Sequence, residues 1–502
     1  MKKLICLILA ITMIFSMLLI GCAKKEEKKT TGDSGVGNVT EESKDDSGIY
    51  DAEIKKLNRT FTFIVRESLS THLNTNEFYA EALNGDKIND SVFVRNAKMN
   101  EVYGTELVEI RDTALQTTYK DSLISGEYVA DFFFTGVSAM KNLGNANLLV
   151  NFYDLTQLNL DKAWWNKTMT DSLAINNKAF YVTGDCATLD DRATWIMIFN
   201  KDIITNAGLE SPYKLVNEGK WTVDAMYKYM QDTAVPGDDG IFQYNKEGDI
   251  VGYCGEVFNN YVHVAAANLY IGEKSADGLI TIPDQPKQEI VDAWSALRTL
   301  LTSNMRYMNG GSTAFLKGWA TFSGLNTAVI TKWAAQEINF GILPFPKVYE
   351  SQTGYYTAPS YAQLGVISIP QTVEADASKD WLKNGFTSAA EQCAYYLEAF
   401  SYWSMNIMTP AFYDQVLSKQ SVSDADSAAN LALTLDTKQI VYDPVAIFNF
   451  GKIGYQVFSN CGADASTMAG DTTKHDEMVS TYTSRVDAAR TAIEEFMNIT
   501  TA

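Results

Sequence analysis

The sequence is poor in histidine and lacks the short motifs that mark common catalytic sites. Its three histidines lie far apart, so it has no HExxH zinc motif, and it has no GxSxG nucleophile elbow. The phosphate-binding GxxxxGKS/T loop is also absent, which excludes the ATPase subunit of a transporter. We therefore predict no catalytic residue and no cofactor, and give no role to His72, His263 or His475. A carboxylate pair for glycoside hydrolysis stays open among the 61 acidic residues, because only its separation in space defines it.

Cysteine is scarce as well. Four of the six cysteines fall in the body of the chain, at wide spacings that form neither a CxxC pair nor a metal-ligand pattern. A location outside the cytoplasm would permit disulfides, but four buried thiols explain the pattern equally well. The sequence leaves both alternatives open and predicts no metal site. The four residues are Cys186, Cys254, Cys393 and Cys461.

Long apolar runs are confined to the N-terminus. Two lysines precede a mostly apolar run from Leu4 to Ile20, which leads into Leu19-Ile20-Gly21-Cys22. This order of charged, apolar and small residues is typical of a secretory signal, although a plain signal or a membrane anchor has a similar layout. The tetrapeptide resembles the lipobox of bacterial lipoproteins, which implies that residues 1–21 are removed and that Cys22 carries a diacylglycerol. Nowhere else does an apolar run approach 18 residues.

Apolar residues are also rare directly after the signal. From Ala23 to Asp51 the chain consists mainly of Lys, Glu, Thr, Ser, Gly and Asp, which cannot bury enough apolar surface to become ordered. We predict a disordered tether over residues 22–57. Such a tether lets a folded body move above the membrane while the lipid holds it there.

Positive charge is in deficit across the chain. With 41 Lys and Arg against 61 Asp and Glu the net charge is −20, and losing Lys2 and Lys3 changes it to −22 (−20 − 2). Such a surface repels phosphate backbones and anionic lipid head groups. The composition argues against nucleic-acid binding and leaves the lipid as the predicted membrane contact.

Aromatic residues, in contrast, are abundant. The chain has 26 Tyr, 24 Phe and 9 Trp, and most of them should pack in the core. Sugar rings have apolar faces that stack on aromatic rings, so a surplus could line a carbohydrate site. The folded body is long enough for more than one compact unit, and we expect two.

The first part of the body alternates between strand and helix patterns. This alternation is typical of a parallel α/β sheet with helices on its faces. Ligands of such sheets gather at the carboxyl ends of the strands, here residues 66–68 and 135–138. We predict strands at 61–65, 107–110 and 131–136, and helices at 90–103, 119–125, 288–303 and 485–497.

One stretch is specific enough to indicate a family. In ATWIMIFNKDIITNAGLE, Ala193 to Glu210, an apolar strand ends in Phe-Asn-Lys-Asp and a helix continues to Ala-Gly-Leu. Asn200 can cap this helix and Gly208 can end it in a left-handed turn. A second possible cap is Thr222 in a Trp-Thr pair. These features resemble the signature of the family 1 extracellular solute-binding proteins of ABC importers.

Three further segments extend the resemblance along the body in the family's order. INDSVFVRNAKMNEVYG resembles its first helices, LVNFYDLTQLNLDKAWW its Asp-Leu-Thr stretch before paired Trp residues, and INFGILPFPKV its Pro-rich strand end. The segments span residues 88–104, 149–165 and 338–348.

The resemblance implies a periplasmic-binding-protein-like α/β fold, with two lobes joined by a hinge and a ligand cleft between them. The chain would cross between lobes near 195–200 and 358–370. A lipid-anchored monomer on the outer face of the cytoplasmic membrane would capture a sugar or oligosaccharide by lobe closure and deliver it to an ABC permease. Predicted lobe 1 comprises residues 58–192 and 312–365, and lobe 2 comprises 193–311 and 366–502.

Two groups of residues are expected to hold the sugar. Carboxylates and amides accept or donate hydrogen bonds with hydroxyls, and an aromatic ring stacks on the sugar face. About half of the chosen tryptophans are expected to be core instead. The strand-end group is Arg66, Glu67, Thr135 and Gly136; the inter-lobe group is Asp185, Asp191, Trp195, Trp319, Tyr361 and Trp403.

Two other functions and one metal stay open. A surface glycosidase on a similar lipoprotein frame, or a sensor that presents its closed form to a membrane kinase, would share these features. The acidic loop from Pro236 to Glu256 is similar to a calcium loop of some relatives. Asn245 and Ile250 stand where an EF-hand requires Asp and Gly, so the loop departs from that pattern, no metal ligand is assigned, and calcium binding stays open.

Overall fold

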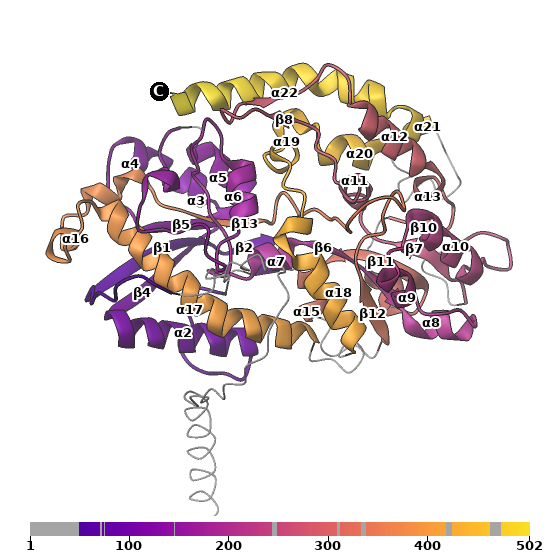
Figure 1. The fold of residues 1–502 in the computed structure, drawn as a ribbon, viewed down its shortest axis with the longest axis horizontal. Helices are drawn as coiled ribbons and strands as arrows, with labels where there is room; N and C mark the ends of the chain where they lie inside the picture. The colour runs from indigo at the N-terminus through magenta and orange to yellow at the C-terminus, as the bar shows by residue number, and fades with distance from the viewer. Residues whose placement is uncertain are drawn as a thin grey trace, which may run out of the picture. The chain divides into compact units, whose positions relative to one another are not determined.

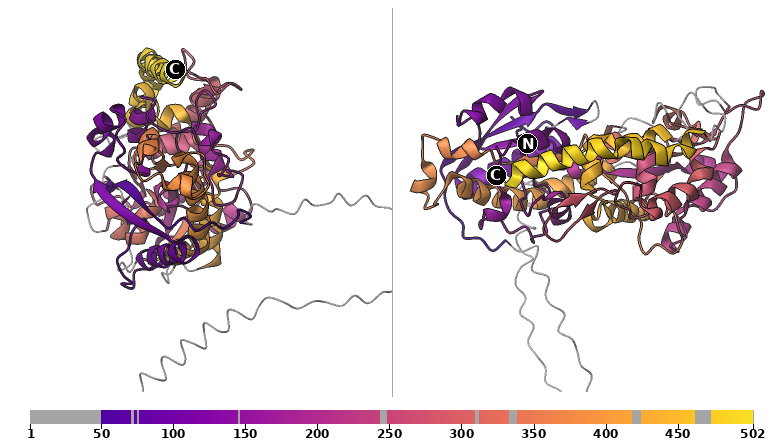
Figure 2. Two further views of the ribbon diagram at one scale, coloured as in Figure 1. Left: turned by 90° about the vertical axis from the view of Figure 1, so that its left-hand side faces the viewer. Right: turned by 90° about the horizontal axis from the view of Figure 1, so that it is seen from above.

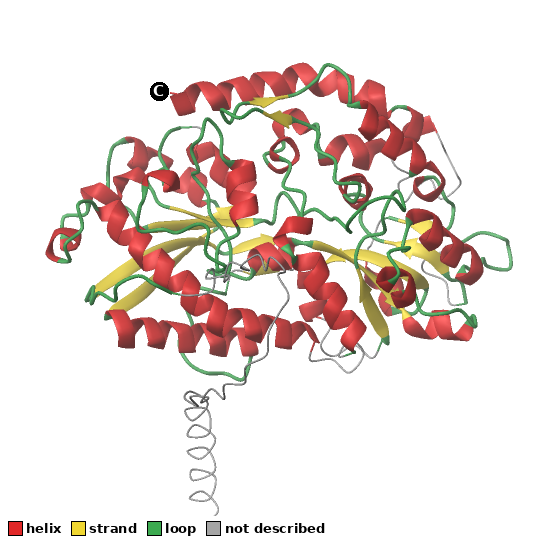
Figure 3. Ribbon diagram, viewed as in Figure 1, coloured by secondary structure: helices red, strands yellow, loops and turns green. Residues whose placement is uncertain are grey.

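A computed structural model of the chain describes residues 50–501, apart from 71–72, 75, 145, 243–247, 309–311, 333–337, 418–423 and 462–472. The predicted signal, Cys22 and most of the tether lie outside the described residues, as does His72. Two mixed sheets lie beside each other, and helices flank both (Figures 1 and 3). Within the described part of the chain, no helix is both long and apolar enough to cross a membrane.

The first sheet contains the three strands predicted near the start of the body. Its order is β13-β5-β1-β4, in which β1 is parallel to β4 and β5 while β13 is antiparallel to β5. The β5 sequence FFFTG is buried throughout, as expected for a central strand covered on both faces. The strands are β1 (Arg59–Arg66), β4 (Thr105–Asp112), β5 (Phe132–Gly136) and β13 (Gly365–Ser368).

Two long helices cover one face of this sheet. α2 (Lys87–Tyr103) begins at an Asp86 cap and ends at Gly104, whose φ of 66° is the left-handed conformation that favours glycine. α17 (Ala389–Leu417) packs along α2 (Figure 1). The other face carries α3 (Leu115–Thr118), α4 (Lys120–Ile124) and α5 (Val137–Gly144), and α6 (Lys167–Leu173) follows.

The second sheet has the order β10-β7-β11-β6-β12. β6 is antiparallel to both of its neighbours, and β11 is parallel to β7. α10 (Val223–Thr233) and α11 (Asn259–Ala265) lie on one face, and α14 (Ser312–Leu316) and α18 (Ala425–Leu435) on the other. The strands are β6 (Trp195–Asn200), β7 (Val251–Cys254), β10 (Arg306–Tyr307), β11 (Ala320–Asn326) and β12 (Phe340–Leu343).

The local signals around β6 are confirmed. Asn200 Oδ1 accepts hydrogen bonds of 3.0 Å from the backbone of Asp202 and Ile203, and so caps α8 (Lys201–Asn206). Gly208 has a φ of 69° just beyond that helix. Thr222 Oγ1 accepts from Ala225 N at 3.2 Å and caps α10.

The sheets divide the chain differently from the predicted lobes in the segment 312–368 and at α17, which packs on the first sheet although we expected it in the second lobe. We expected residues 312–365 in the first lobe, but β11 and β12 both pair with β6 in the second sheet. β13, expected in the second lobe, pairs with β5 in the first. The reason is long-range antiparallel pairing, which the strand sequences do not encode. The chain therefore passes between the sheets at α7 (Leu189–Ala193) and again between β12 and β13.

The C-terminal region spans the body. α22 (Met478–Thr501) runs along one edge, and Asn176 Nδ2 donates to the Met497 carbonyl at 2.9 Å (Figure 2). The four body cysteines are buried free thiols. The predicted helix at 288–303 forms as α12 (Gln288–Ala296) and α13 (Arg298–Leu301), and α22 contains the one predicted at 485–497. The remaining elements are β2 (Ser68–Ser70), β3 (Leu73–Asn74), β8 (Glu273–Lys274), β9 (Ile280–Thr281), α9 (Tyr213–Asn217), α15 (Thr327–Lys332), α16 (Asp380–Lys383), α19 (Pro444–Ile447), α20 (Tyr455–Cys461) and α21 (Thr473–Asp476).

Candidate functional site

The predicted strand-end residues lie at one edge of the first sheet. β1 and β5 are parallel neighbours, so Arg66 and Glu67 at the end of β1 lie near Thr135 and Gly136 at the end of β5. Thr135 is fully buried, and its Oγ1 has no hydrogen-bond partner within the described structure. A Cβ on Gly136 would lie 2.7 Å from the Ala362 carbonyl oxygen, so this close approach requires glycine.

The segment 358–364 joins the edges of the two sheets. Trp195 N, at the start of β6, donates to the Ala358 carbonyl at 3.2 Å. Val137 N, directly after β5, donates to the Leu364 carbonyl at 2.9 Å. A shift of one lobe against the other must therefore change the conformation of this segment, which we call the crossing segment.

Aromatic rings from the second lobe surround the crossing segment. The ring of Tyr361 lies 4.7 Å from that of Tyr455 and 6.2 Å from that of Phe258, measured between centroids. Gln456 Nε2 donates to the Tyr361 hydroxyl at 3.4 Å. Tyr361, Phe258 and Gln456 are only half-buried, so this cluster combines aromatic faces with polar atoms near the surface.

Two buried polar atoms beside this cluster are unpartnered within the described structure. Trp195 and Asn326 are register partners at the ends of β6 and β11, and each is 5% exposed. Asn326 Nδ2 donates to Gln363 Oε1 at 2.7 Å, but Asn326 Oδ1 and Trp195 Nε1 have no partner. Buried polar atoms are normally hydrogen-bonded, so a water or a ligand is needed to satisfy them.

A cavity of about 160 Å³ lies on the other side of the α7 segment. Its wall is formed by the loops on either side of α6, by α17 and by the end of α18, so it draws on elements that pack on both sheets. We call it the junction pocket. Its lining residues are Ala163, Trp165, Asn166, Gly184, Asp185, Ala187, Thr188, Asp190, Asp191, Thr409, Tyr413, Leu435 and Thr437.

Three aspartates dominate the chemistry of the junction pocket. Burial raises the pKa of Asp185 to about 6, and burial together with the Asp185 charge raises the pKa of Asp190 to about 7. Burial, Asp190 and Asp185 raise the pKa of Asp191 well above its usual value. Burial raises the pKa of the Tyr413 hydroxyl, as does its proximity to the same three carboxylates. Thr409 Oγ1 donates to Asp185 Oδ1.

The nearest arginine is engaged outside the junction pocket. Arg192 Nη1 lies 2.6 Å from Glu77 Oε1, and Glu77 also accepts from Thr188 N at 2.5 Å and from Thr188 Oγ1 at 2.6 Å. Glu77 therefore ties the segment after β1 to α7 and uses the Arg192 charge. The lining of the pocket combines three carboxyl groups with hydroxyl, amide and indole groups, and it contains no Lys or Arg side chain.

The structure brings most of the predicted residues to the region between the sheets, but not to one surface. Asp185 and Asp191 line the junction pocket. Trp195 and Tyr361 lie at the crossing segment.

Two of the predicted tryptophans lie elsewhere. Trp319 precedes β11 at the end opposite Asn326, roughly 23 Å away at strand spacing, and Lys317 Nζ lies 5.9 Å from its ring centroid. Trp403 lies on α17, 5.2 Å from the Tyr402 ring and 5.3 Å from Lys98 Nζ. Neither residue lines the junction pocket or belongs to the crossing segment.

The sequence analysis missed several residues of the site. Asp190 is adjacent to the predicted Asp191, and Trp165 belongs to the paired Trp stretch, so the sequence offered a reason to include both. For Asn326 and Tyr413 it offered none, because each reaches the site through pairing or packing with distant segments. The missed residues are Phe258, Asn326, Gln363, Tyr455 and Gln456 at the crossing segment, and Trp165, Asn166, Asp190, Thr409 and Tyr413 in the junction pocket.

Over the residues that the structure describes, no group of three or more His, Cys, Asp or Glu side chains could hold a metal ion. Residues 243–247 of the acidic loop, including Asn245, lie outside the described residues.

The comparisons with known proteins identify the fold. No protein-family model matches the chain, and no curated protein matches it in sequence. The GacH receptor of Streptomyces glaucescens, solved without ligand and with acarbose, is 14% identical, with a TM-score of 0.51 over 87% of this chain and 98% of that one. A sugar transporter of Rhizobium etli in an open conformation is 15% identical (TM-score 0.51, 88% and 99% covered). A cyclo/maltodextrin-binding protein complexed with maltotetraose is 12% identical (TM-score 0.50, 89% and 98% covered). The predicted periplasmic-binding-protein-like fold is confirmed: the chain has the α/β fold of these three solved structures.

Proposed function

We propose that this protein is a lipid-anchored solute-binding protein that captures a sugar or small oligosaccharide between its lobes and delivers it to an ABC permease. The observation that carries the proposal is the junction pocket, in which Asp185, Asp190 and Asp191 face Tyr413 in about 160 Å³ between elements of both lobes. The known ligands of the similar structures, acarbose and maltotetraose, are oligosaccharides.

The chemistry of the pocket suits hydroxyl groups. Each carboxylate can accept from sugar hydroxyls, Tyr413 can donate or accept, and the Trp165 and Tyr413 rings offer faces for stacking. At the crossing segment, Trp195 Nε1 and Asn326 Oδ1 supply one donor and one acceptor. A second sugar unit of an oligosaccharide would use these atoms together with the half-buried ring of Tyr361.

Closure would follow from differential contacts. A ligand that touches both lobes binds the closed form more tightly than the open form, and shifts the population towards it by that difference in affinity. The crossing segment and α7 connect the sheets, so they would absorb the change in backbone angles. The permease would then distinguish the closed form from the open one.

Thermal-shift screening of the mature protein against mono- and oligosaccharides tests the binding. One sugar class should raise the melting temperature with increasing concentration and be recovered unchanged. The same panel, run with Asp191→Asn, should lose most of the shift. If no sugar stabilises the protein while another class of polar solute does, the proposed ligand class is wrong.

A glycosidase remains the main rival, because a raised pKa on a carboxyl beside a second carboxyl is also what a general acid requires. Chromogenic glycosides separate the two functions. Turnover that Asp190→Asn abolishes would establish the enzyme, whereas stabilisation without product supports the receptor. A sensor for a membrane kinase would bind the same sugar, but cells would not accumulate the labelled sugar through it.

The lipid anchor is a separate part of the proposal. Cys22, outside the described residues, would carry the diacylglycerol on the outer face of the cytoplasmic membrane. The Cys22→Ser substitution should move the protein out of the detergent-rich phase in a phase-partition experiment. Unchanged partitioning would contradict lipidation at this residue.

A further inference from the structure

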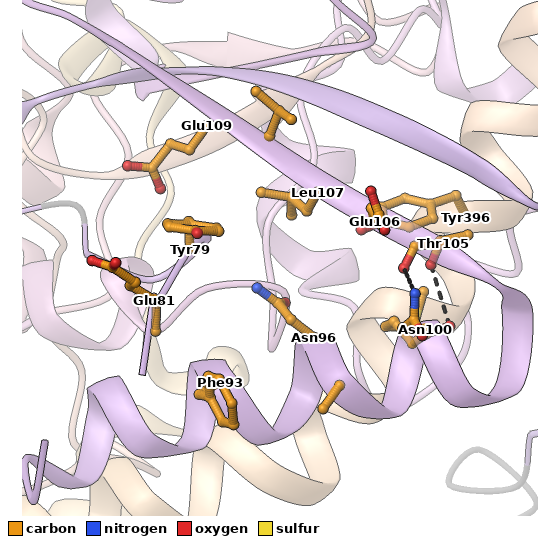
Figure 4. A pocket seen from close by; sticks show the side chains of 14 residues that line it. Tyr79, Glu81, Phe93, Asn96, Asn100, Thr105, Glu106, Leu107, Glu109 and Tyr396 are labelled. Carbon is orange, nitrogen blue, oxygen red and sulfur yellow. Dashed lines mark hydrogen bonds between the residues drawn. The ribbon is translucent and has the colours of Figure 1, made fainter. Parts of the chain in front are cut away.

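A groove on the first lobe lies between α2 and β4, and none of its lining residues belongs to the junction pocket (Figure 4). It has a volume of about 580 Å³ and is open to solvent along one side. We call it the edge groove. It is lined by Tyr79, Ala80, Glu81, Phe93, Asn96, Ala97, Met99, Asn100, Thr105, Glu106, Leu107, Val108, Glu109 and Tyr396.

The floor of the edge groove is the free edge of a sheet. β4 pairs with β1 only and ends the first sheet on this side, within the described strands. Five consecutive residues of β4, Thr105 to Glu109, line the groove. Side chains of a strand alternate between the two faces, so consecutive lining residues mean that the backbone edge itself faces the groove. Such an edge offers unpaired N–H and C=O groups to another strand.

At one end of the edge groove lies a buried carboxylate that can accept a further hydrogen bond. The Glu109 side chain is 4% exposed, and one of its oxygens accepts from Arg111 Nε at 2.5 Å. Its other oxygen, Oε2, has no hydrogen-bond partner within the described structure. Figure 4 shows this carboxylate at the same end of the groove as Tyr79 and Glu81. Burial raises the pKa of Glu109 by more than the Arg111 charge and the nearby Tyr79 backbone N–H lower it.

The charge and polarity around the edge groove favour a cationic, partly apolar partner. Its lining contains three glutamates, Glu81, Glu106 and Glu109, and neither Lys nor Arg. Large apolar side chains on the rim are well exposed: Tyr79 is 49% exposed and Val108 is 46% exposed. The other end of the groove is closed by a hydrogen bond of 3.3 Å from Asn100 Nδ2 to the Thr105 carbonyl.

We propose that the edge groove binds an extended peptide segment of a partner protein, which adds a strand to β4 and places a Lys or Arg side chain on Glu109 Oε2. The five lining residues of β4 extend over roughly 13 Å, which matches a peptide of about five residues rather than a single amine. Backbone hydrogen bonds to β4 would supply affinity, and the glutamates and the exposed rim would supply selectivity. This site is independent of the sugar function, since no lining residue belongs to the junction pocket or the crossing segment.

A fluorescent peptide of alternating Val and Lys, with blocked ends, is the probe, and its binding to the mature protein is measured by fluorescence anisotropy. Glu109→Gln should weaken binding by roughly ten- to a hundredfold, which is the loss expected for a charge-assisted hydrogen bond. Glu350→Gln removes the same charge from an exposed position on the second lobe, and should leave binding unchanged. The melting temperature of each variant verifies its fold.

Two further probes on the unaltered protein keep the test independent of any folding defect. The same peptide with N-methylated backbone amides cannot pair with β4 and should bind at least about tenfold more weakly. N-acetyl-lysine methylamide, a single cation, should show no measurable binding. The proposal is overturned if the Val-Lys peptide does not bind, if the N-methylated peptide or Glu109→Gln leaves its affinity unchanged, or if the single cation binds equally well.

Discussion

The junction pocket and the edge groove both contain buried carboxylates, but they are built in opposite ways. The junction pocket gathers residues from segments more than 200 positions apart, between Trp165 and Thr437, and from elements that pack on both sheets. The edge groove is built mainly from α2 and β4, which the single residue Gly104 connects. A site of the first kind changes shape when the lobes move, whereas one of the second kind does not. Ligand binding at the junction pocket should therefore report lobe closure, and binding at the edge groove should be indifferent to it.

The largest expected effect is a pH dependence of stability that belongs to the junction pocket. In the folded protein the pKa of Asp185 is about 6, above its ordinary value. The stabilisation that protonation provides is thus complete only below the ordinary pKa of 3.8, and it is lost as the pH rises through about 6. For this shift, the free energy of unfolding should fall by about 2–3 kcal/mol between pH 4 and pH 7.

Denaturant unfolding of the wild type and of Asp185→Asn over this pH range measures that contribution together with the effect of Asp185 on Asp190 and Asp191. The wild type should lose stability relative to the variant as the pH rises, because the amide does not titrate. Other carboxylates with lowered pKa values, such as Asp424, change stability in the opposite direction but equally in both proteins. A constant difference between the two proteins would contradict the burial of Asp185.

The second largest expected effect is a loss of affinity at one site that leaves affinity at the other site unchanged. Asp191→Asn keeps the shape of the side chain but replaces one carboxyl oxygen with an amide nitrogen, which cannot accept a hydrogen bond from a sugar hydroxyl, so sugar affinity should fall by roughly tenfold or more. The affinity of the Val-Lys peptide for the edge groove should not change. Glu109→Gln is the matched control: it should weaken binding of the Val-Lys peptide and leave sugar affinity unchanged. Isothermal titration of both ligands against both variants measures the comparison, and any variant that weakens both ligands would break it.

A smaller effect is expected from filling the gap between β5 and the crossing segment. In Gly136→Ala the new methyl group would meet the Ala362 carbonyl oxygen at 2.7 Å, and neither backbone can yield freely. Unfolding should become easier by about 1–2 kcal/mol, and sugar affinity should fall as the crossing segment shifts. Peptide affinity at the edge groove again serves as the internal control. Unfolding with urea gives the first quantity and titration the second.

The smallest effect concerns the unpartnered indole at the crossing segment. Trp195→Phe keeps an aromatic ring and removes Nε1, which has no hydrogen-bond partner among the described residues. If an oligosaccharide reaches this atom, its affinity should fall by roughly fivefold while that of a monosaccharide is retained. Equal losses for both sugars would mean that the indole acts through packing alone.

Much of the first lobe could be predicted from the chain, because its signals are local. Phe61–Val65 and Phe132–Gly136 are continuous apolar runs followed by polar or glycine residues, and such runs form central strands in almost any α/β context. Asn200, Gly208 and Thr222 act within three or four residues of their own position, so their roles as caps and stops were predictable too. Each of these features depends on burial or hydrogen bonding within a single element, so the local sequence is enough to predict it.

The sequence by itself determined the order of strands and helices, the caps, and the strand ends at which a ligand would be expected. Only the tertiary structure decided that β11 and β12 join the second sheet, and that Tyr413 and Thr409 reach Asp185 and Asp191. It also placed Trp195 at the crossing segment and Trp319 at the other end of the second sheet, although the sequence predicted both as ligand-binding residues. The physical reason is that spacing along the chain specifies which face of an element is buried. Antiparallel pairing and helix packing decide which distant element covers that face. Both depend on many residues from different parts of the chain at once.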